Sequence, residues 1–379
     1  MQTVRIGVIG LGMGGSHARR LMEGQIRRAT LAAVCDLAPE RRAPFAAAAR
    51  CFDDAGALFR SGTVDAVVIA TPHYAHTTLG IQALKRGLHV LVEKPVSVHK
   101  ADAERLIAAH TNPRQVFAAM FNMRAVPGFA AVRRLVQAGE LGALRRVNWI
   151  STDWFRTDAY YASGGWRATW KGEGGGVLLN QCPHQLDLLQ WIAGMPARVQ
   201  ARCAFGKYHP IEVEDEVTAV LEYANGATGV FLASTGEAPG TNRLELCGDR
   251  GKIVVEHGRF LFVQNAVPMD VYRRESPERT QPPGVVCAEI PAPPPPLPPH
   301  AAILQNFAAN ILDGTPLIAP AEEGIRSVEL ANAMILSSLR RAPVDLPLDG
   351  RRFARALRGL IRQSEAARRP AATRGSTRG

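Results

Sequence analysis

The segment that most constrains the fold is an apolar run followed directly by a glycine-rich turn and a helical run, near the start of the chain. The run covers residues 4–9, the turn residues 10–15 and the helical part residues 17–22. A G-x-G-x-x-G turn between a strand and a helix lets the backbone approach a pyrophosphate, which then lies at the helix N-terminus. A glycine turn can also serve chain geometry alone. The expected contacts are at Gly10, Gly12, Met13 and Gly15.

Over the first 122 residues, short apolar runs alternate with helix-like segments. This alternation is typical of βαβ units stacked into a parallel sheet. A helix is expected over residues 75–86, ending at Gly87. We therefore predict an α/β fold with a doubly wound Rossmann domain over residues 1–122. The expected strands are residues 4–9, 31–35, 66–70, 89–92 and 116–120.

Asp36 ends the second expected strand, about 20 residues after the glycines. A carboxylate at this place accepts hydrogen bonds from the adenosine ribose hydroxyls and repels the extra phosphate of NADP. NAD is therefore favoured over NADP. Arg41 and Arg42 keep NADP open, because an arginine there could pair with a phosphate, although exposed helix arginines are the simpler interpretation.

Two polar segments follow the next strands, Thr71-Pro72 through His76 and then Glu93-Lys94-Pro95. Ligands of open α/β sheets bind outside the carboxyl ends of the strands, so both segments should border the cofactor. An isolated Glu-Lys-Pro is usually an exposed turn, and His76 could simply pack against its helix. A lysine beside a cationic nicotinamide ring would have its pKa lowered, which suits proton transfer.

A second domain is expected over residues 123–349, with an open, mainly antiparallel sheet in an α+β arrangement. Its clearest signal is a hairpin over residues 217–223 and 227–233, joined through Asn225-Gly226. Seven prolines within residues 291–299 indicate an extended surface connection, and an SH3-type ligand is the alternative. The other expected elements are helices over 126–138, 300–312 and 322–340 and a strand over 145–152.

The net charge of +11 is concentrated at the end of the chain, where residues 351–379 carry nine arginines and one glutamate. We expect residues 350–379 to form a basic, partly disordered tail and expect no nucleic-acid partner. The six cysteines lie far apart with no short Cys/His cluster, which predicts no metal site. With no signal-like or membrane-spanning run, a cytoplasmic location away from membranes is expected.

These motifs, read with the segment Gly174-Gly175-Gly176 through His184 and Asp187, resemble the Gfo/Idh/MocA family. The likeness covers most of residues 1–349, including Asn122 to Pro127, Trp166-Arg167 and the turn at 248–252. It implies a Rossmann domain, an open-faced substrate domain, bound NAD or NADP, and a homodimer or homotetramer formed through the C-terminal sheet.

The resemblance also implies roles for individual residues. Lys94 matches the active-site lysine and His184 the histidine that exchanges a proton with the reacting hydroxyl. Asn180 stands where the family's dehydrogenases often have aspartate, and an amide can hold a hydroxyl but cannot take up a proton. Asp187 would orient His184 or cap its helix. By the same resemblance Trp166 and Arg167 lie near the nicotinamide, and Arg124 and Asp153, with Asn180 and His184, would line the substrate pocket. A packing or surface role is the alternative for Arg124, Asp153, Trp166 and Arg167. The residues expected at the cofactor from their place at the strand ends are Thr71, Pro72, His76 and Glu93.

The expected function is hydride transfer between NAD and a ring secondary alcohol or ketone of a sugar or cyclitol. An alternative within the same fold is redox-neutral cleavage of a glycoside through a keto sugar, which needs a second base. A third reading is a non-catalytic sensor of NAD or sugars, against which the presence of both Lys94 and His184 argues.

Overall fold

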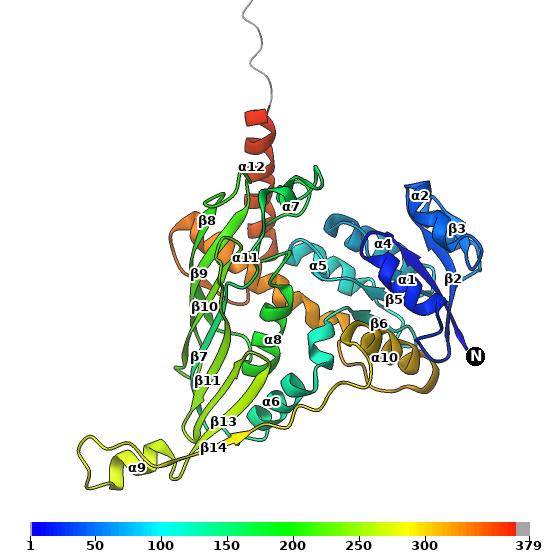
Figure 1. The fold of residues 1–379 in the computed structure, drawn as a ribbon. Coiled ribbons are helices and arrows are strands. Elements are labelled where there is room, and N and C mark those ends of the chain that lie inside the picture. The colour runs from blue at the N-terminus through cyan, green and yellow to red at the C-terminus, as the bar shows by residue number, and fades with distance from the viewer. Residues whose placement is uncertain (1, 369–379) are drawn as a thin grey trace, which may run out of the picture.

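The computed structural model describes residues 2–368, and its first six strands form one parallel sheet (Figure 1). The strand order β3-β2-β1-β4-β5-β6 is that of a doubly wound Rossmann domain, so the predicted fold class is confirmed. All four residues of β4 are buried, as expected for a strand covered on both faces. The strands are β1 (Val4–Ile9), β2 (Ala29–Cys35), β3 (Arg50–Phe52), β4 (Ala66–Ile69), β5 (His89–Val92) and β6 (Phe117–Ala119).

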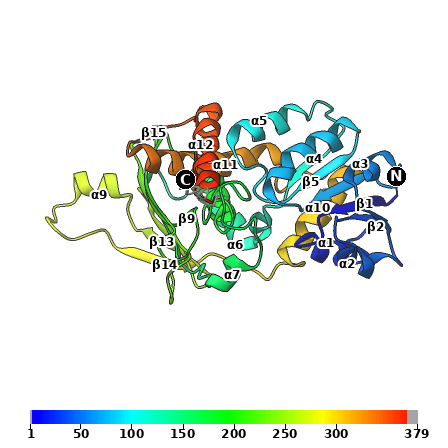
Figure 2. The same cartoon turned by 90° about the horizontal axis from the view of Figure 1, so that it is seen from above.

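Helices cover both faces of this sheet (Figure 2). They are α1 (Gly14–Met22), α2 (Pro39–Arg42), η1 (Ala43–Phe45), α3 (Ala55–Arg60), α4 (His73–Lys85) and α5 (Lys100–Ala108). The edge strand β3 was not expected from the sequence, because only three residues pair with β2 and two of them are exposed.

The second sheet has nine strands in the order β14-β13-β12-β11-β7-β10-β9-β8-β15. Its pairs are antiparallel except β7 with β10. The predicted hairpin is the β9–β10 pair, and Gly226 at its turn has φ +85°. The strands are β7 (Leu144–Ser151), β8 (Arg198–Phe205), β9 (Glu214–Glu222), β10 (Thr228–Ser234), β11 (Asn242–Gly248), β12 (Gly251–Glu256), β13 (Arg259–Asn265), β14 (Val285–Glu289) and β15 (Val344–Asp345).

Helices α8 and α11 pack against this sheet, while α9 and the exposed strand β14 extend away at its edge (Figure 1). Burial alternates along β9, so one face of the sheet is covered and the other is open. The helical segments are η2 (Asn122–Ala125), α6 (Pro127–Gln137), α7 (Asp158–Ala162), α8 (Pro183–Ala193), α9 (Met269–Glu275), α10 (Pro299–Asp313), η3 (Ala321–Gly324) and α11 (Ile325–Arg340).

Helix α10 belongs to the core of the Rossmann sheet although it comes late in the chain. Ile303, Leu304 and Phe307 are buried within the same apolar cluster as the strands β1 and β4. The proline-rich residues 291–298 lead to it as an exposed, extended segment. The Rossmann unit therefore includes α10 in addition to residues 1–122.

The expectation of a loose tail from residue 350 is wrong for the described part. Residues Gly350–Arg368 form a long helix, α12, which buries Phe353 and Leu357 in the core of the second domain. Its first residue packs against Ala101 of α5. The apolar residues repeat at helical spacing and bury one stripe, while the arginines point outward. Residues 369–379, also part of the expected tail, lie outside the described residues.

The docking of α12 predicts a loss of stability in Phe353→Ala. Removing a fully buried phenylalanine should lower the free energy of unfolding by about 3–5 kcal/mol, because the cavity cannot refill. Urea unfolding measures the change, with exposed Arg355→Ala on the same helix as the control. Equal stability of both variants would contradict a docked helix.

Candidate functional site

The first glycine of the predicted dinucleotide turn is required by the backbone itself. Gly10 has φ +83°, and a Cβ there would lie 2.6 Å from the carbonyl oxygen of Ala70. Beyond it the turn is open, since a Cβ on Gly15 would meet no atom within 4 Å and one on Gly12 only Arg41, at 3.9 Å. Helix α1 starts without a side-chain cap, so no side chain competes with an anion for its first N–H groups. This open cradle fits a pyrophosphate.

Asp36 lies beside this turn, as the sequence predicts. Its carboxylate accepts hydrogen bonds from the backbone N–H of Leu11, at 2.7 Å, and of Ala38, at 2.9 Å. Arg41 lies 3.8 Å from the same carboxylate and reaches across Gly12. Arg41 is thereby drawn to Asp36, which weakens the case for a dedicated phosphate ligand of NADP.

Glu93 is anchored beneath the glycine turn by a residue that sequence analysis missed. His17, buried in α1, contacts the Glu93 carboxylate at 2.8 Å, and the amide of Lys94 donates to its other oxygen. Burial alone would raise the pKa of Glu93, but the hydrogen bond and charge of its partners lower it to about 2. Glu93 therefore ties α1 to the end of β5 as an anion.

His76 differs from its predicted place at the cofactor. It is buried, and its two ring nitrogens lie 2.8 Å from the backbone oxygens of Pro95 and Thr71. These contacts link the loop after β4 to the loop after β5, so His76 holds the two loops together. Thr71 and Pro72 remain at the predicted edge, and the Thr71 hydroxyl has no hydrogen-bond partner among residues 2–368.

Lys94 points from the end of β5 to the second domain. Its ammonium donates a 2.7 Å hydrogen bond to the backbone oxygen of Asn180. Burial lowers the pKa of Lys94, although the carboxylates of Glu93 and Glu173 oppose the change. The residue as a whole is only partly buried, while its amine is desolvated.

His184 lies in the first turn of α8, and its ring packs edge-on against Phe121, with centroids 6.3 Å apart. Burial, reinforced by the charge of Lys94, lowers the pKa of His184 to about 3. The ring is therefore neutral near pH 7. Its Nδ1 is buried without a hydrogen-bond partner among residues 2–368, which leaves Nε2 as the nitrogen for a ligand.

The triple glycine before Asn180 is explained by close backbone approach. A Cβ on Gly176 would lie 2.0 Å from the Glu214 carbonyl oxygen, and one on Gly174 would lie 2.0 Å from Val98. The buried carboxylate of Glu214 accepts hydrogen bonds from the amides of Gly176 and Leu178, while burial raises its pKa to about 7. Sequence analysis missed Glu214, whose partners lie almost 40 residues away.

Asn180 is held by a second carboxylate that sequence analysis missed. The Asn180 side-chain amide donates to Glu173, which is 1% exposed. Glu173 also accepts a 2.6 Å hydrogen bond from the backbone N–H of Ala168. Burial raises the pKa of Glu173, and these donors with Arg167 oppose the rise. A glutamate just before three glycines is the only sequence signal that could have pointed to it.

Arg124 differs from its expected place in the substrate pocket. Its side chain is fully buried, with two hydrogen bonds to Asp187, at 2.6 and 2.7 Å, and one to Glu323. Asp187 is engaged by Arg124 and Gln190, and the N-cap position of α8 is Cys182, so Asp187 takes neither of its expected roles of orienting His184 or capping the helix. This ion pair joins η2, α8 and η3 in the interior.

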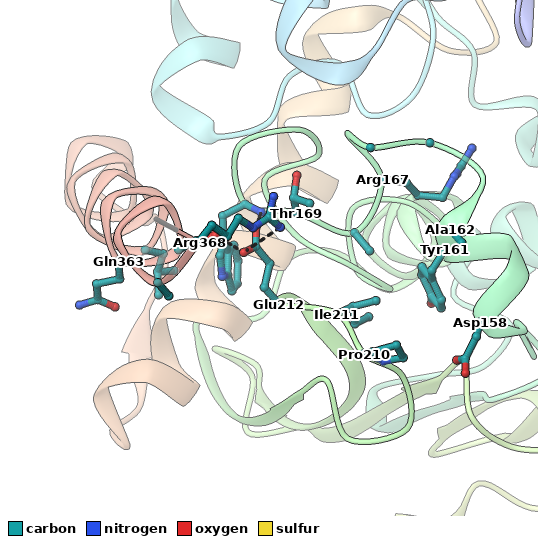
Figure 3. A pocket seen from close by; sticks show the side chains of 17 residues that line it. Asp158, Tyr161, Ala162, Arg167, Thr169, Pro210, Ile211, Glu212, Gln363 and Arg368 are labelled. Carbon is teal, nitrogen blue, oxygen red and sulfur yellow. Dashed lines mark hydrogen bonds and ion pairs between the residues drawn. The ribbon is translucent and has the colours of Figure 1, made fainter. Parts of the chain in front are cut away.

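Trp166 and Arg167 lie near the loop after β4. The Trp166 ring packs edge-on against His73, with centroids 6.4 Å apart, and Arg167 lies over both Trp166 and Tyr160. Arg167 also borders a pocket of about 760 Å³ between residues 158–170 and the last turns of α12 (Figure 3). Lys94, Asn180 and His184 do not line this pocket.

Asp153 borders a different cavity, of about 580 Å³, with Met123, Trp149 and the prolines 293–295. It accepts a 3.1 Å hydrogen bond from Asn242. Lys94, Asn180 and His184 do not line this cavity either.

Among residues 2–368, no three His, Cys, Asp or Glu side chains gather in a way that could hold a metal ion. No helix in that range is long and apolar enough to cross a membrane.

Comparisons with known proteins match both domains. A family described as an oxidoreductase family with an NAD-binding Rossmann fold matches residues 4–120, and the GFO/IDH/MocA C-terminal domain matches residues 129–254.

Among curated relatives, an inositol 2-dehydrogenase of Rhizobium meliloti is 25% identical over 91% of this chain and 99% of its own length. A levoglucosan dehydrogenase of Pseudarthrobacter phenanthrenivorans is 27% identical over 71% and 78%. Among solved structures, the WlbA dehydrogenase of Bordetella pertussis, in complex with NADH and UDP-GlcNAcA, has a TM-score of 0.75 and 26% identity over 92% of this chain and 100% of its own.

The position of Asp36 predicts which cofactor the Rossmann domain prefers. Asp36→Ala should weaken NADH binding about 10-fold to 100-fold, because it removes a charged hydrogen-bond acceptor, and should weaken NADPH binding less. Fluorescence titration of reduced cofactor measures both, with exposed Asp53→Ala as the charge-matched control. An equal loss for both cofactors would remove Asp36 from ribose recognition.

Proposed function

Because the chain belongs to the Gfo/Idh/MocA family of oxidoreductases, we propose that it transfers hydride between NAD and a ring secondary alcohol or ketone of a sugar or cyclitol. The observation that carries the proposal is the desolvated amine of Lys94, which lies beside Asn180 where the two domains meet. The charge of this amine also lowers the pKa of His184. Inositol and levoglucosan dehydrogenases among the relatives support this substrate class.

The Rossmann half would hold the dinucleotide. The open turn at Gly12, Met13 and Gly15 would receive the pyrophosphate, and Asp36 the adenosine ribose. Thr71, Pro72 and Glu93, with Trp166 and Arg167 from the second domain, would border the other end. When bound, NAD supplies the hydride acceptor or donor for the substrate carbon.

Lys94 and His184 would handle the proton of the reacting hydroxyl. In oxidation the neutral amine of Lys94 takes the hydroxyl proton, and in reduction its ammonium returns one to the ketone oxygen. His184 enters as a neutral imidazole, because burial keeps its pKa far below neutral. It can then hydrogen-bond the substrate hydroxyl at Nε2 and help orient the alcohol. Asn180 would hold a hydroxyl of the same ring.

Two other functions are weaker on specific grounds. Glycoside cleavage through a keto sugar needs a second base beside the substrate. Glu173 is a carboxylate close by, but it is buried behind Asn180 and already accepts two hydrogen bonds. A sensor without turnover would not need the desolvated lysine that the geometry provides.

The assembly and location follow from the same proposal. The open face of the second sheet exposes apolar side chains such as Val220 on β9, which fits a homodimer or homotetramer formed through this sheet. We place the enzyme in the cytoplasm, where NAD-linked sugar metabolism supplies its substrates.

Removing the amine tests the proposal directly. Lys94→Ala should lower kcat by about 10²-fold to 10⁴-fold while NADH still binds, because the proposed pyrophosphate and adenosine-ribose contacts lie on other loops. Steady-state kinetics over a panel of sugars and cyclitols with NAD, and NADH titration, provide the measurements. Exposed Lys85→Ala is the matched control. Wild-type turnover in Lys94→Ala would contradict the proposed mechanism.

The imidazole should contribute on the same scale as a general acid–base partner. His184→Ala should reduce turnover by about 10²-fold to 10⁴-fold. His184→Gln, which keeps a polar group of similar reach, should recover only the part that comes from orienting the alcohol. Full activity in His184→Ala would leave Lys94 as the sole proton-handling residue.

The lowered pKa of Lys94 predicts the pH dependence. Alcohol oxidation requires the neutral amine, so kcat/KM should rise with pH and level off below the ordinary lysine value of 10.5. His184, with a pKa of about 3, stays neutral across this range and should add no second inflection to the pH profile of kcat/KM. A profile over roughly pH 6 to 10 measures this. A limb that vanishes in His184→Ala would instead assign it to the imidazole.

A further inference from the structure

Glu173 is a buried carboxylate with a fixed hydrogen-bond arrangement. Its Oε2 accepts from the backbone N–H of Ala168 at 2.6 Å, and its Oε1 accepts from Nδ2 of Asn180. Arg167 lies 4.0 Å from Oε1, and Lys94 is the other cation that acts on it. The backbone donor cannot change its role, so each carboxylate oxygen has one assigned partner.

This arrangement decides which end of the Asn180 amide is offered to a ligand. A carboxylate only accepts hydrogen bonds, so the amide must turn its NH₂ toward Glu173. Its Oδ1 then faces away, and it accepts no hydrogen bond from any of residues 2–368. Asn180 is only partly buried, and its backbone oxygen holds the Lys94 ammonium. The free oxygen is therefore presented beside the proposed proton acceptor.

We propose that Glu173 is a positioning residue that fixes Asn180 as a hydrogen-bond acceptor, so that the site selects a hydroxyl group next to the reacting carbon. The inference rests on the proposed function, since it assigns a subsite for the same polyol. A hydroxyl can donate to Oδ1, whereas a ring carbonyl or carboxylate there would place two acceptors together, at a cost of a buried unmade hydrogen bond. The site would thus recognise a neighbouring hydroxyl through the Asn180 oxygen, because Glu173 fixes which end of the amide faces the ligand.

Glu173→Gln inverts that polarity with almost no change of shape. The new side chain keeps an oxygen for the Ala168 amide and turns its NH₂ to Asn180, which must then rotate and offer its own NH₂ to the ligand. Polyol affinity should fall about 10-fold to 100-fold. Affinity for NADH should not change.

The double variant Glu173→Gln with Asn180→Asp should restore affinity. The introduced glutamine then donates to the introduced aspartate, whose second oxygen accepts a substrate hydroxyl again. In Asn180→Asp alone, two carboxylates meet and must share a proton, so affinity should fall. A purely structural role for Glu173 predicts that the double variant is at least as impaired as the worse single variant, because each change removes native contacts.

Calorimetric titration of a polyol into the preformed NADH complex of each variant provides the measurement, with thermal unfolding to confirm folding. Recovery in the double variant supports the inference, and equal affinities or a double variant worse than both singles overturn it. Turnover is assayed separately. If the wild type binds the polyol without turnover, the proposed reaction fails while the affinity series still decides the role of Glu173. If the wild type binds no polyol, the substrate class and the inference fail together.

Discussion

The guanidinium of Arg124 ties the segment that follows the Rossmann sheet to the helix that carries His184. It leaves the Rossmann sheet on η2, pairs with Asp187 on the helix that carries His184, and reaches Glu323 just before α11. The pairing with Asp187 is bidentate, which fixes orientation as well as distance. Breaking a buried pair by removing one partner costs roughly 3–5 kcal/mol, because the remaining charge stays buried. The ion pair therefore fixes the helix that carries His184 to the chain that leaves the Rossmann sheet.

Much of the Rossmann half was readable from the sequence because its signals are local. The turn at Gly10, the buried run of β4 and the position of Asp36 each lie within a few residues of the feature they define. The Asn225-Gly226 hairpin is equally local, since the turn type fixes its register. The carboxyl ends of parallel strands share one edge, so Lys94 could be predicted at that edge of the sheet without coordinates.

The contacts that could not be predicted join residues far apart in sequence. Arg124 was expected in the substrate pocket, because nothing nearby in the sequence reveals Asp187 and Glu323 as its partners. The role of Glu173 could not be predicted, because its contact with Asn180 forms only in the folded structure. In α12 the arginines dominated the composition and concealed the spacing of Phe353 and Leu357. The position of His76 after a strand was visible in the sequence, but a histidine there can join two loops as well as bind a ligand.

Because α10 comes late in the chain, the Rossmann core cannot be completed during synthesis until most of the second domain has been made. The six strands of the first sheet are complete at Ala119, yet the apolar surface that receives Phe307 stays uncovered until α10 emerges, some 180 residues later. At roughly 5–20 residues per second, that interval lasts about 10 to 35 seconds. During it, a nascent dinucleotide domain exposes part of its interior to chaperones and to other chains, and only synthesis of the second domain ends the exposure.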